Sequence, residues 1–100
     1  MTHRALYVRL EAKPGKQQEV ASFLENALAL VNEERETTAW FALRMTQNAF
    51  GIFDAFPNDH GRDAHLNGAV AKALMARAPD LFSKPPEIQK LDVLAEKLPH

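Results

Sequence analysis

The sequence predicts one α+β domain in which helices cover a face of an antiparallel sheet. Apolar residues recur at every second position in some segments and at every third or fourth position in others, which distinguishes strands from helices. A length of 100 residues, with 46% hydrophobic and 25% charged residues, is typical of a single globular core. We therefore expect one domain over residues 1–100.

The first half of the chain predicts a strand, a turn and a helix. Residues 4–12 alternate apolar and polar side chains, and residues 13–16 break the strand with Pro14 and Gly15. Residues 17 to about 34 follow as a helix with apolar spacings of three and four. The apolar positions of this helix are Val20, Phe23, Leu24, Ala27, Leu28 and Val31.

The second half predicts two strands, a helix and a last strand. Residues 37–45 and 50–56 are rich in β-branched and aromatic side chains, and the short polar link between them favours an antiparallel pair. Asn58 or Asp59 is expected to cap a helix that runs to about residue 78. Pro79 should end that helix, residues 80–83 should form a short helical turn, and residues 88–95 the last strand.

The order strand, helix, strand, strand, helix, strand is that of a ferredoxin-like βαββαβ fold, a four-stranded antiparallel sheet with two helices on one face. The other face would carry Tyr7, Phe53 and either Trp40 or Phe41. A face this apolar is unfavourable in water. We therefore expect a homodimer formed face to face.

Three local patterns resemble the antibiotic biosynthesis monooxygenase family of the dimeric α+β barrel superfamily. They are the strand and turn of residues 8–16, the strand of residues 50–56 with an acidic residue two before a large aromatic, and the segment of residues 63–66 with a histidine about nine residues after that aromatic. The resemblance covers nearly the whole chain. It implies a homodimer with a pocket in each subunit between sheet and helices.

Characterised members of that family include monooxygenases that oxidise electron-rich polycyclic phenols to quinones without a cofactor, and enzymes that open haem oxidatively. This sequence has Phe56 where the family commonly has tryptophan. It also lacks the asparagine that haem-degrading relatives carry on the first strand, because Asn26 and Asn32 lie in the predicted helix. Haem degradation is therefore not expected.

His65 is the first candidate catalytic residue, at the edge of the apolar stripe of the second helix. An imidazole titrates near neutral pH, so His65 is suited to act as a general base toward a phenol. The alternative is a structural histidine in the seam between helix and sheet, with a ring nitrogen bonded to a strand carbonyl or a carboxylate.

Asp54 is the second candidate, because it has the same strand parity as Phe50, Ile52 and Phe56 and should point into the same layer. It could orient His65, as an acidic group orients a catalytic imidazole. Alternatively, it could pair with Arg44 or Arg62 or cap a backbone group. Both interpretations remain open at this stage.

Aromatic side chains are numerous enough to line a flat apolar pocket. We expect substrate-pocket roles for Trp40, Phe41, Phe56 and Arg62, with packing in the core or at a dimer interface as the alternative for the aromatic residues. The run of residues 32–36 is interpreted as a solvated helix end. His60 and His65 are five residues apart and cannot share a helix face as metal ligands, so we expect no metal site.

Composition excludes several classes of function. Twelve basic against thirteen acidic residues give a net charge of −1, which disfavours nucleic acid and anionic membranes as partners. The absence of cysteine removes disulfides and thiolate chemistry, and we expect a cytoplasmic protein. The resemblance to the monooxygenase family implies that no cofactor is bound. The first hypothesis is a cofactor-independent monooxygenase acting on an aromatic or polyketide-type small molecule. The alternative is a non-catalytic dimeric protein of the same fold that binds a small molecule or acts as an accessory protein.

Overall fold

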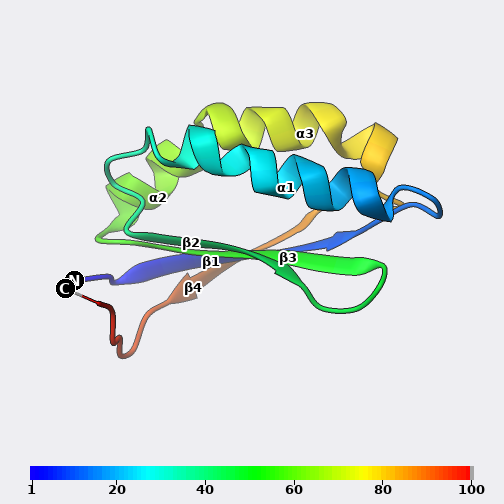
Figure 1. Ribbon diagram of the computed structural model, residues 1–100. Coiled ribbons are helices and arrows are strands. Elements are labelled where there is room, and N and C mark those ends of the chain that lie inside the picture. The colour runs from blue at the N-terminus through cyan, green and yellow to red at the C-terminus, as the bar shows by residue number, and fades with distance from the viewer. Residues whose placement is uncertain (100) are drawn as a thin grey trace.

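The chain forms a four-stranded antiparallel sheet in a computed structural model that describes residues 1–99 (Figure 1). Its strands, in the spatial order β2-β3-β1-β4, are β1 (Arg4–Glu11), β2 (Ala39–Arg44), β3 (Ala49–Phe56) and β4 (Glu87–Asp92). Both neighbours of β1 and the β2–β3 hairpin are antiparallel. The predicted ferredoxin-like fold is confirmed.

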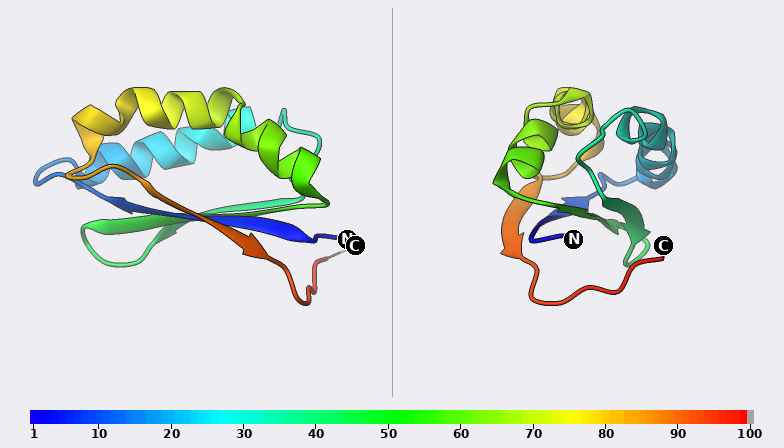
Figure 2. Two further views of the ribbon diagram at one scale, coloured as in Figure 1. Left: turned by 180° about the vertical axis from the view of Figure 1, so that it is seen from behind. Right: turned by 90° about the vertical axis from the view of Figure 1, so that its left-hand side faces the viewer.

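The helices of residues 1–99 all lie on one side of the sheet, and no helix covers the other side, below which the C-terminal segment runs at one end (Figure 2). The helices are α1 (Gln17–Val31), α2 (Asp59–Leu66) and α3 (Ala69–Leu81). The helices α1 and α3 run along the sheet side by side, and α2 covers the end of the sheet where β3 finishes (Figure 1). No helix within residues 1–99 has the length and apolar character needed to span a membrane.

Strand alternation decides which side chains enter the core. On β3, the side chains of Phe50, Ile52, Asp54 and Phe56 are all buried under the helices, as the sequence parity predicts. The core is completed by apolar residues of β1, α1 and α3, among them Leu10, Val20, Leu24, Leu74 and Leu81. One carboxylate thus lies within an otherwise apolar layer.

The open face presents apolar side chains of three strands. In the strand register Phe53 lies between Tyr7 and Phe41. Phe41 is 52% exposed, and Leu43 and Met45 beside it are also exposed. The Tyr7 hydroxyl donates to the Met45 sulfur at 3.0 Å, so the tyrosine lies along the face rather than extending into solvent.

Two helix starts follow the local signals of the sequence. Gly15 has φ of 81°, a left-handed conformation that glycine adopts without strain, and α1 begins two residues later. The Asn58 side chain accepts a hydrogen bond from the backbone N–H of Gly61 at 2.9 Å and caps α2. The predicted cap at Asn58 is confirmed.

The prediction of a single second helix running to residue 78 is wrong, because the helix is interrupted at Asn67 and Gly68, between α2 and α3. Pro79 does not end the helix either. It lies inside the last turn of α3, where the Phe82 N–H still bonds to the Ala78 carbonyl at 3.0 Å. Proline removes only one donor, and so close to the helix end that loss is tolerated.

The remaining boundaries shift by a few residues. The first helix ends at Val31 rather than near residue 34, and the residues that follow form turns. The last strand covers Glu87–Asp92 instead of residues 88–95, although the Val93 N–H still bonds to the His3 carbonyl. The loop after α1 therefore begins earlier than predicted, and this loop contributes to the site described next.

Candidate functional site

A histidine held between two carboxylates lies where α2, β3 and the loop after α1 meet. The Nε2 atom of His65 is 2.9 Å from Oδ2 of Asp54, and its Nδ1 atom is 2.5 Å from Oε1 of Glu34. The Thr37 hydroxyl donates to the same Glu34 oxygen at 2.6 Å. His65 and Asp54, predicted from different elements, are thus brought together.

These groups are almost entirely removed from water. The side chains of Asp54 and His65 are 1% and 7% exposed, while that of Glu34 is 18% exposed. The ring of Phe56 lies against the imidazole, with 5.3 Å between ring centroids. The arrangement has an apolar inner end at Asp54 and a partly open outer end at Glu34.

The contact between Asp54 and His65 couples the protonation of the two side chains. Burial by itself lowers the pKa of His65, but the contacts with Asp54 and Glu34 outweigh it and raise that pKa above its ordinary value. Burial also raises the pKa of Asp54, against the opposing effect of the imidazole. Either both ring nitrogens donate to carboxylates, or a protonated Asp54 donates to a neutral ring.

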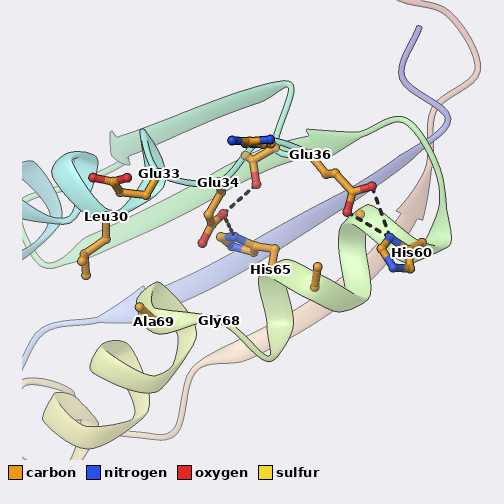
Figure 3. Close-up of a pocket in the computed structure, with 12 residues that line it drawn as sticks. Leu30, Glu33, Glu34, Glu36, His60, His65, Gly68 and Ala69 are labelled. Atoms are coloured by element: carbon orange, nitrogen blue, oxygen red, sulfur yellow. Dashed lines mark hydrogen bonds and ion pairs between the residues drawn. The ribbon is translucent and has the colours of Figure 1, made fainter.

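The outer end of this network opens into a pocket of about 600 Å³. Its walls come from the end of α1, the loop before β2, α2 and the start of α3 (Figure 3). Leu30, Ala64 and Ala69 provide apolar surface, and Glu34 and His65 lie at its inner wall. This volume is within the range of small-molecule sites.

The predicted pocket residues occupy other places. Phe56 is fully buried behind His65, and Trp40 packs against the core, so neither lines this pocket. Phe41 lies on the open face of the sheet. It pairs with Phe53 in the strand register, whereas its neighbour Ala42 pairs with the buried Ile52 on the covered face. The apolar floor of the pocket comes from helix residues instead.

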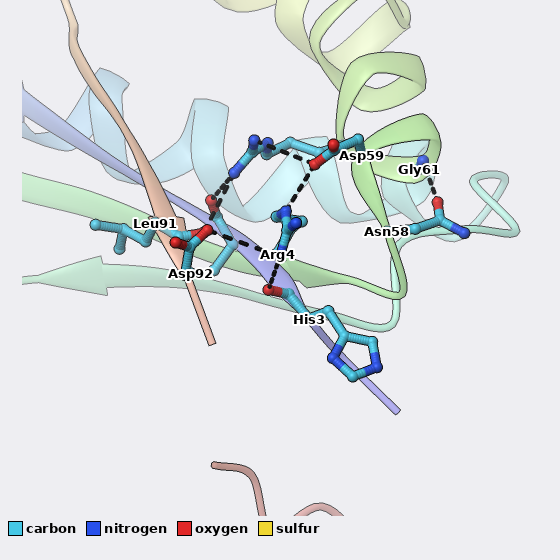
Figure 4. A network of polar contacts seen from close by, with 9 residues as sticks. His3, Arg4, Asn58, Asp59, Gly61, Leu91 and Asp92 are labelled. Atoms are coloured by element: carbon cyan, nitrogen blue, oxygen red, sulfur yellow. Dashed lines mark hydrogen bonds and ion pairs between the residues drawn. The ribbon is translucent and has the colours of Figure 1, made fainter. Parts of the chain in front are cut away.

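Arg62 does not line this pocket, and it ties α2 to the sheet next to the Arg4–Asp59 pair shown in Figure 4. One of its terminal nitrogens donates to the carbonyls of Ala5 and Leu91, at 3.4 and 3.2 Å. Asp59, 3.5 Å from Arg62, also pairs with Arg4 at 2.7 Å. Asp54 therefore pairs with His65 and not with Arg62, and Arg44 lies over the Phe50 ring.

Glu34 is the residue that sequence reasoning missed. The run of residues 32–36 was expected to be a solvated helix end, and for Glu34 this is wrong because the loop turns back over α2. An acidic run with no periodic pattern contains no signal for such a turn. Only the pairing of a buried histidine with a second carboxylate, seen in three dimensions, identifies it.

Other clusters of chemical interest are few. His60 is exposed and bonds to Glu36 at 2.9 Å, at the end of the pocket away from Glu34 (Figure 3). Within residues 1–99, no group of three or more His, Asp or Glu side chains has the arrangement needed to hold a metal ion. The Asp54–His65–Glu34 network is therefore the candidate site.

Comparison with solved structures gives both a relative and a fold. A protein of unknown function from Nitrosomonas europaea, NE2512, is 57% identical over 100% of this chain and 97% of its own, with a TM-score of 0.98. A "putative antibiotic biosynthesis monooxygenase" from the same organism is 14% identical over 92% of this chain and 90% of its own, with a TM-score of 0.81.

A protein of the same description from Caulobacter crescentus is 16% identical over 94% of this chain and 92% of its own, also with a TM-score of 0.81. At these identities the two monooxygenase-like structures establish a common fold. No protein-family model matches the chain, and no curated protein matches it.

Proposed function

This chain belongs to the same family as NE2512, and from its site we propose that it oxygenates an aromatic or polyketide-type small molecule without a bound metal or flavin. The observation that carries this proposal is the Asp54–His65–Glu34 network at the inner wall of the pocket. The reaction class is supported by the fold shared with two structures that are each described as a "putative antibiotic biosynthesis monooxygenase".

The network suits the removal of a proton from a phenol. The side chain of Glu34 lies at the pocket wall and is 18% exposed, so in this proposal its carboxylate accepts the proton of a substrate hydroxyl, with His65 and Asp54 behind it. Once Glu34 holds the hydroxyl proton it is neutral, and the positive charge of an imidazolium at His65 then favours the phenolate. Asp54 acts as a positioning residue because it fixes the orientation of the ring.

The overall reaction balances with molecular oxygen as the oxidant. For a phenol with a free position opposite its hydroxyl, one oxygen atom replaces the ring hydrogen and forms the second quinone carbonyl. The other oxygen atom leaves as water with that ring hydrogen and the hydroxyl hydrogen. The chain's part is to hold the ring and to accept the hydroxyl proton, and oxygen accepts the electrons.

The test measures oxygen uptake and quinone formation with 1-naphthol as the probe. We expect His65→Gln, which keeps the size and a hydrogen-bond donor of the side chain, to lower the rate by about 10²–10⁴-fold. The control is His3→Ala, at an exposed histidine outside the pocket, which should retain the full rate. An unchanged rate in well-folded His65→Gln protein would contradict the proposal.

A non-catalytic binding protein is the second candidate, and one observation favours it. Both ring nitrogens of His65 already have carboxylate partners, as in a structural histidine. In that case His65→Gln would lower the free energy of unfolding by about 1–3 kcal/mol and leave ligand affinity unchanged. Measuring the rate, the stability and the affinity on the same variant separates the two functions.

We also propose that the chain acts as a homodimer through the open face of its sheet. Phe41, Leu43 and Met45 are 52%, 40% and 39% exposed there, next to Tyr7 and Phe53. A second copy covering this face would remove a contiguous apolar surface from water, which is favourable at about 25 cal/mol per Å². The pockets lie on the opposite, helical side and would stay accessible.

A further inference from the structure

The loop of residues 32–38, which joins α1 to β2 and which we call the strap, lies against α2. Its backbone is bonded near its ends, where the N–H groups of Glu34 and Thr38 donate to carbonyls of α1 and β3 at 2.9 Å. In the part of the chain that the structure describes, residues 35–37 make no backbone hydrogen bond. Side chains therefore decide how firmly the middle of the strap is held.

Two histidines of α2 contact two glutamates of the strap (Figure 3). His65 lies 2.5 Å from Glu34, and His60 lies 2.9 Å from Glu36. Each contact is an ion pair only when its histidine is protonated. The His60 side chain is 81% exposed and the His65 side chain is buried, so the pair with Glu34 is the stronger of the two.

The backbone of the strap also approaches α2 closely. A Cβ atom built on Gly61 would lie 3.2 Å from the carbonyl oxygen of Glu36, so a side chain at this position would press against the strap. The strap itself contains no apolar residue. Lifting it from α2 therefore takes little apolar surface of its own into water, and its contacts are mainly electrostatic.

Protonation reverses the sign of the charge that α2 presents to the strap. The strap has three glutamates and one arginine, which gives a net charge of −2. Helix α2 has two aspartates, one arginine and two histidines, so its net charge is −1 with neutral histidines and +1 with protonated ones. The two segments repel each other in the first state and attract each other in the second.

The other elements packed against α2 add few charges near the two histidines. Strand β3 adds Asp54 beside His65. Strand β1 adds Arg4, which is already paired with Asp59 at 2.7 Å. The first three residues of α3 are uncharged. The protonation of the histidines is therefore the main variable in the attraction between α2 and the strap.

The loss of a proton should release Glu34 rather than Asp54. A neutral imidazole has a single N–H for two ionised carboxylates. Asp54 is 1% exposed and cannot turn to water, whereas Glu34 is 18% exposed and can. Although burial lowers the pKa of His65, the contacts with Asp54 and Glu34 raise this pKa overall above 6.5, so the release is expected above that pH.

We propose that the strap is a pH-dependent closure of the pocket, which lies on α2 while His65 and His60 are protonated and lifts from α2 when they are neutral. Residues 33–37 form part of the wall of this pocket of about 600 Å³, so their movement changes access to it. The inference goes beyond the proposed function, because it concerns the loop and requires no turnover.

The test follows the motion of the strap with a spin label. Because the chain contains no cysteine, a nitroxide can be attached at one chosen position, either Arg35→Cys in the exposed middle of the strap or Lys72→Cys, an exposed cation on α3. Electron paramagnetic resonance gives the ratio of mobile to immobile label. From pH 6 to pH 9 we expect this ratio to rise by about tenfold at position 35 and to stay constant at position 72.

Variants of the chain labelled at position 35 identify the contact responsible. Glu34→Gln should give a mobile label already at pH 6 and abolish most of the rise. The matched control Glu33→Gln makes the same charge change at an exposed neighbouring position of the strap and should keep the rise. His60→Gln should reduce the rise only slightly, because its pair is exposed.

Equal mobility of the label at position 35 at pH 6 and pH 9 would overturn the proposal, and so would an equal rise at position 72 or a full rise in Glu34→Gln. The comparison of the two label positions decides the question even if Glu34→Gln folds poorly. Since no ligand is added, the result does not depend on whether 1-naphthol is oxidised.

Discussion

Each of the two faces of the sheet carries side chains that its exposure to solvent does not explain. The face covered by helices buries Asp54 and brings His65 onto it, whereas the open face displays Phe41, Leu43 and Met45. Usually the covered face is apolar and the exposed one polar. The difference teaches that each face has a requirement of its own, a partner for a buried charge on one face and a cover for exposed apolar side chains on the other.

On the covered face the requirement is a partner for a charge. A buried carboxylate is retained at a cost unless it is paired, and leucine at the same position would be less costly to bury. Asp54 is paired with a histidine that reaches a pocket through Glu34. On the open face the requirement is a surface that covers the aromatic side chains.

The largest expected effect concerns the open face. Phe53→Glu places a charge between Tyr7 and Phe41, at the centre of the proposed dimer interface. Burying that charge unpaired costs about 3–5 kcal/mol, so the dimer should weaken by roughly a hundred- to several-thousandfold. Sedimentation equilibrium measures this change.

The control for that variant is Met75→Glu, because Met75 is 53% exposed on α3, on the helical side of the sheet. It should leave the dimer intact. A stable, folded monomer formed by the unmodified chain at micromolar concentration would remove the reason for the apolar open face and contradict the homodimer.

The next largest effect concerns the covered face. Asp54→Ala removes one partner of a buried pair, and we expect the free energy of unfolding to fall by about 3–5 kcal/mol in urea titrations. Asp59→Ala is the matched control, since Asp59 pairs with Arg4 at 2.7 Å on the surface with its side chain 65% exposed. Exposed pairs contribute about 0–1 kcal/mol. Equal losses in the two variants would show that Asp54 is not specially buried or paired.

The sequence predicted most of the fold because periodicity records burial. The alternation along β3 predicted that Asp54 points into the covered layer and that Phe53 points to the open face. The apolar spacing of three and four predicted α1. The sequence does not reveal the interruption between α2 and α3, because Gly68 lies within a stretch of otherwise helical composition. Pro79 was predicted to end the helix, but it lies inside α3. Whether a glycine or a proline ends a helix depends on the tertiary contacts around it.

The candidate site was only half predictable. His65 and Asp54 could be placed on facing elements by their parity, and the structure brings them together. Glu34 lies in a loop, where no period constrains the direction of a side chain, and its contact with His65 spans 31 positions of the chain. The aromatic residues expected at the pocket lie in the core and on the open face. Strand parity predicts the face of the sheet to which a side chain points, but not which cavity it lines.

A smaller effect is expected from pH. The pKa of His65 is raised in the folded protein, so its contribution to stability is complete below the unfolded value of 6.5 and is lost as pH rises through the folded value. Asp54 acts in the same direction, because burial raises its pKa from 3.8 and favours the protonated form. The melting temperature should therefore be higher at pH 6 than at pH 9.

The slope of this pH dependence should be reduced in His65→Gln and kept in His60→Gln, because His60 is paired at the surface with its side chain 81% exposed. Thermal melts of the three proteins over the same pH range make the comparison. A melting temperature of the unmodified protein that is constant or rises from pH 6 to pH 9 would contradict the raised pKa of His65.

The smallest effect tests how the covered face holds its site in place. Asn58 caps α2, the short helix that carries His65, while the N-cap of α3 is a glycine without a side-chain bond. Asn58→Ala should cost about 1 kcal/mol of unfolding free energy, because the Gly61 N–H loses its acceptor. Asn26→Ala, at an exposed position within α1, should change stability by no more than about 0.5 kcal/mol.

Since Arg62 also anchors α2 to the carbonyls of Ala5 and Leu91, the loss of the Asn58 cap should leave both the dimer and the His65 contacts in place. Titration of the His65 ring by NMR measures the second point, and a large change there in Asn58→Ala would show that the cap, and not the two carboxylates, positions the histidine.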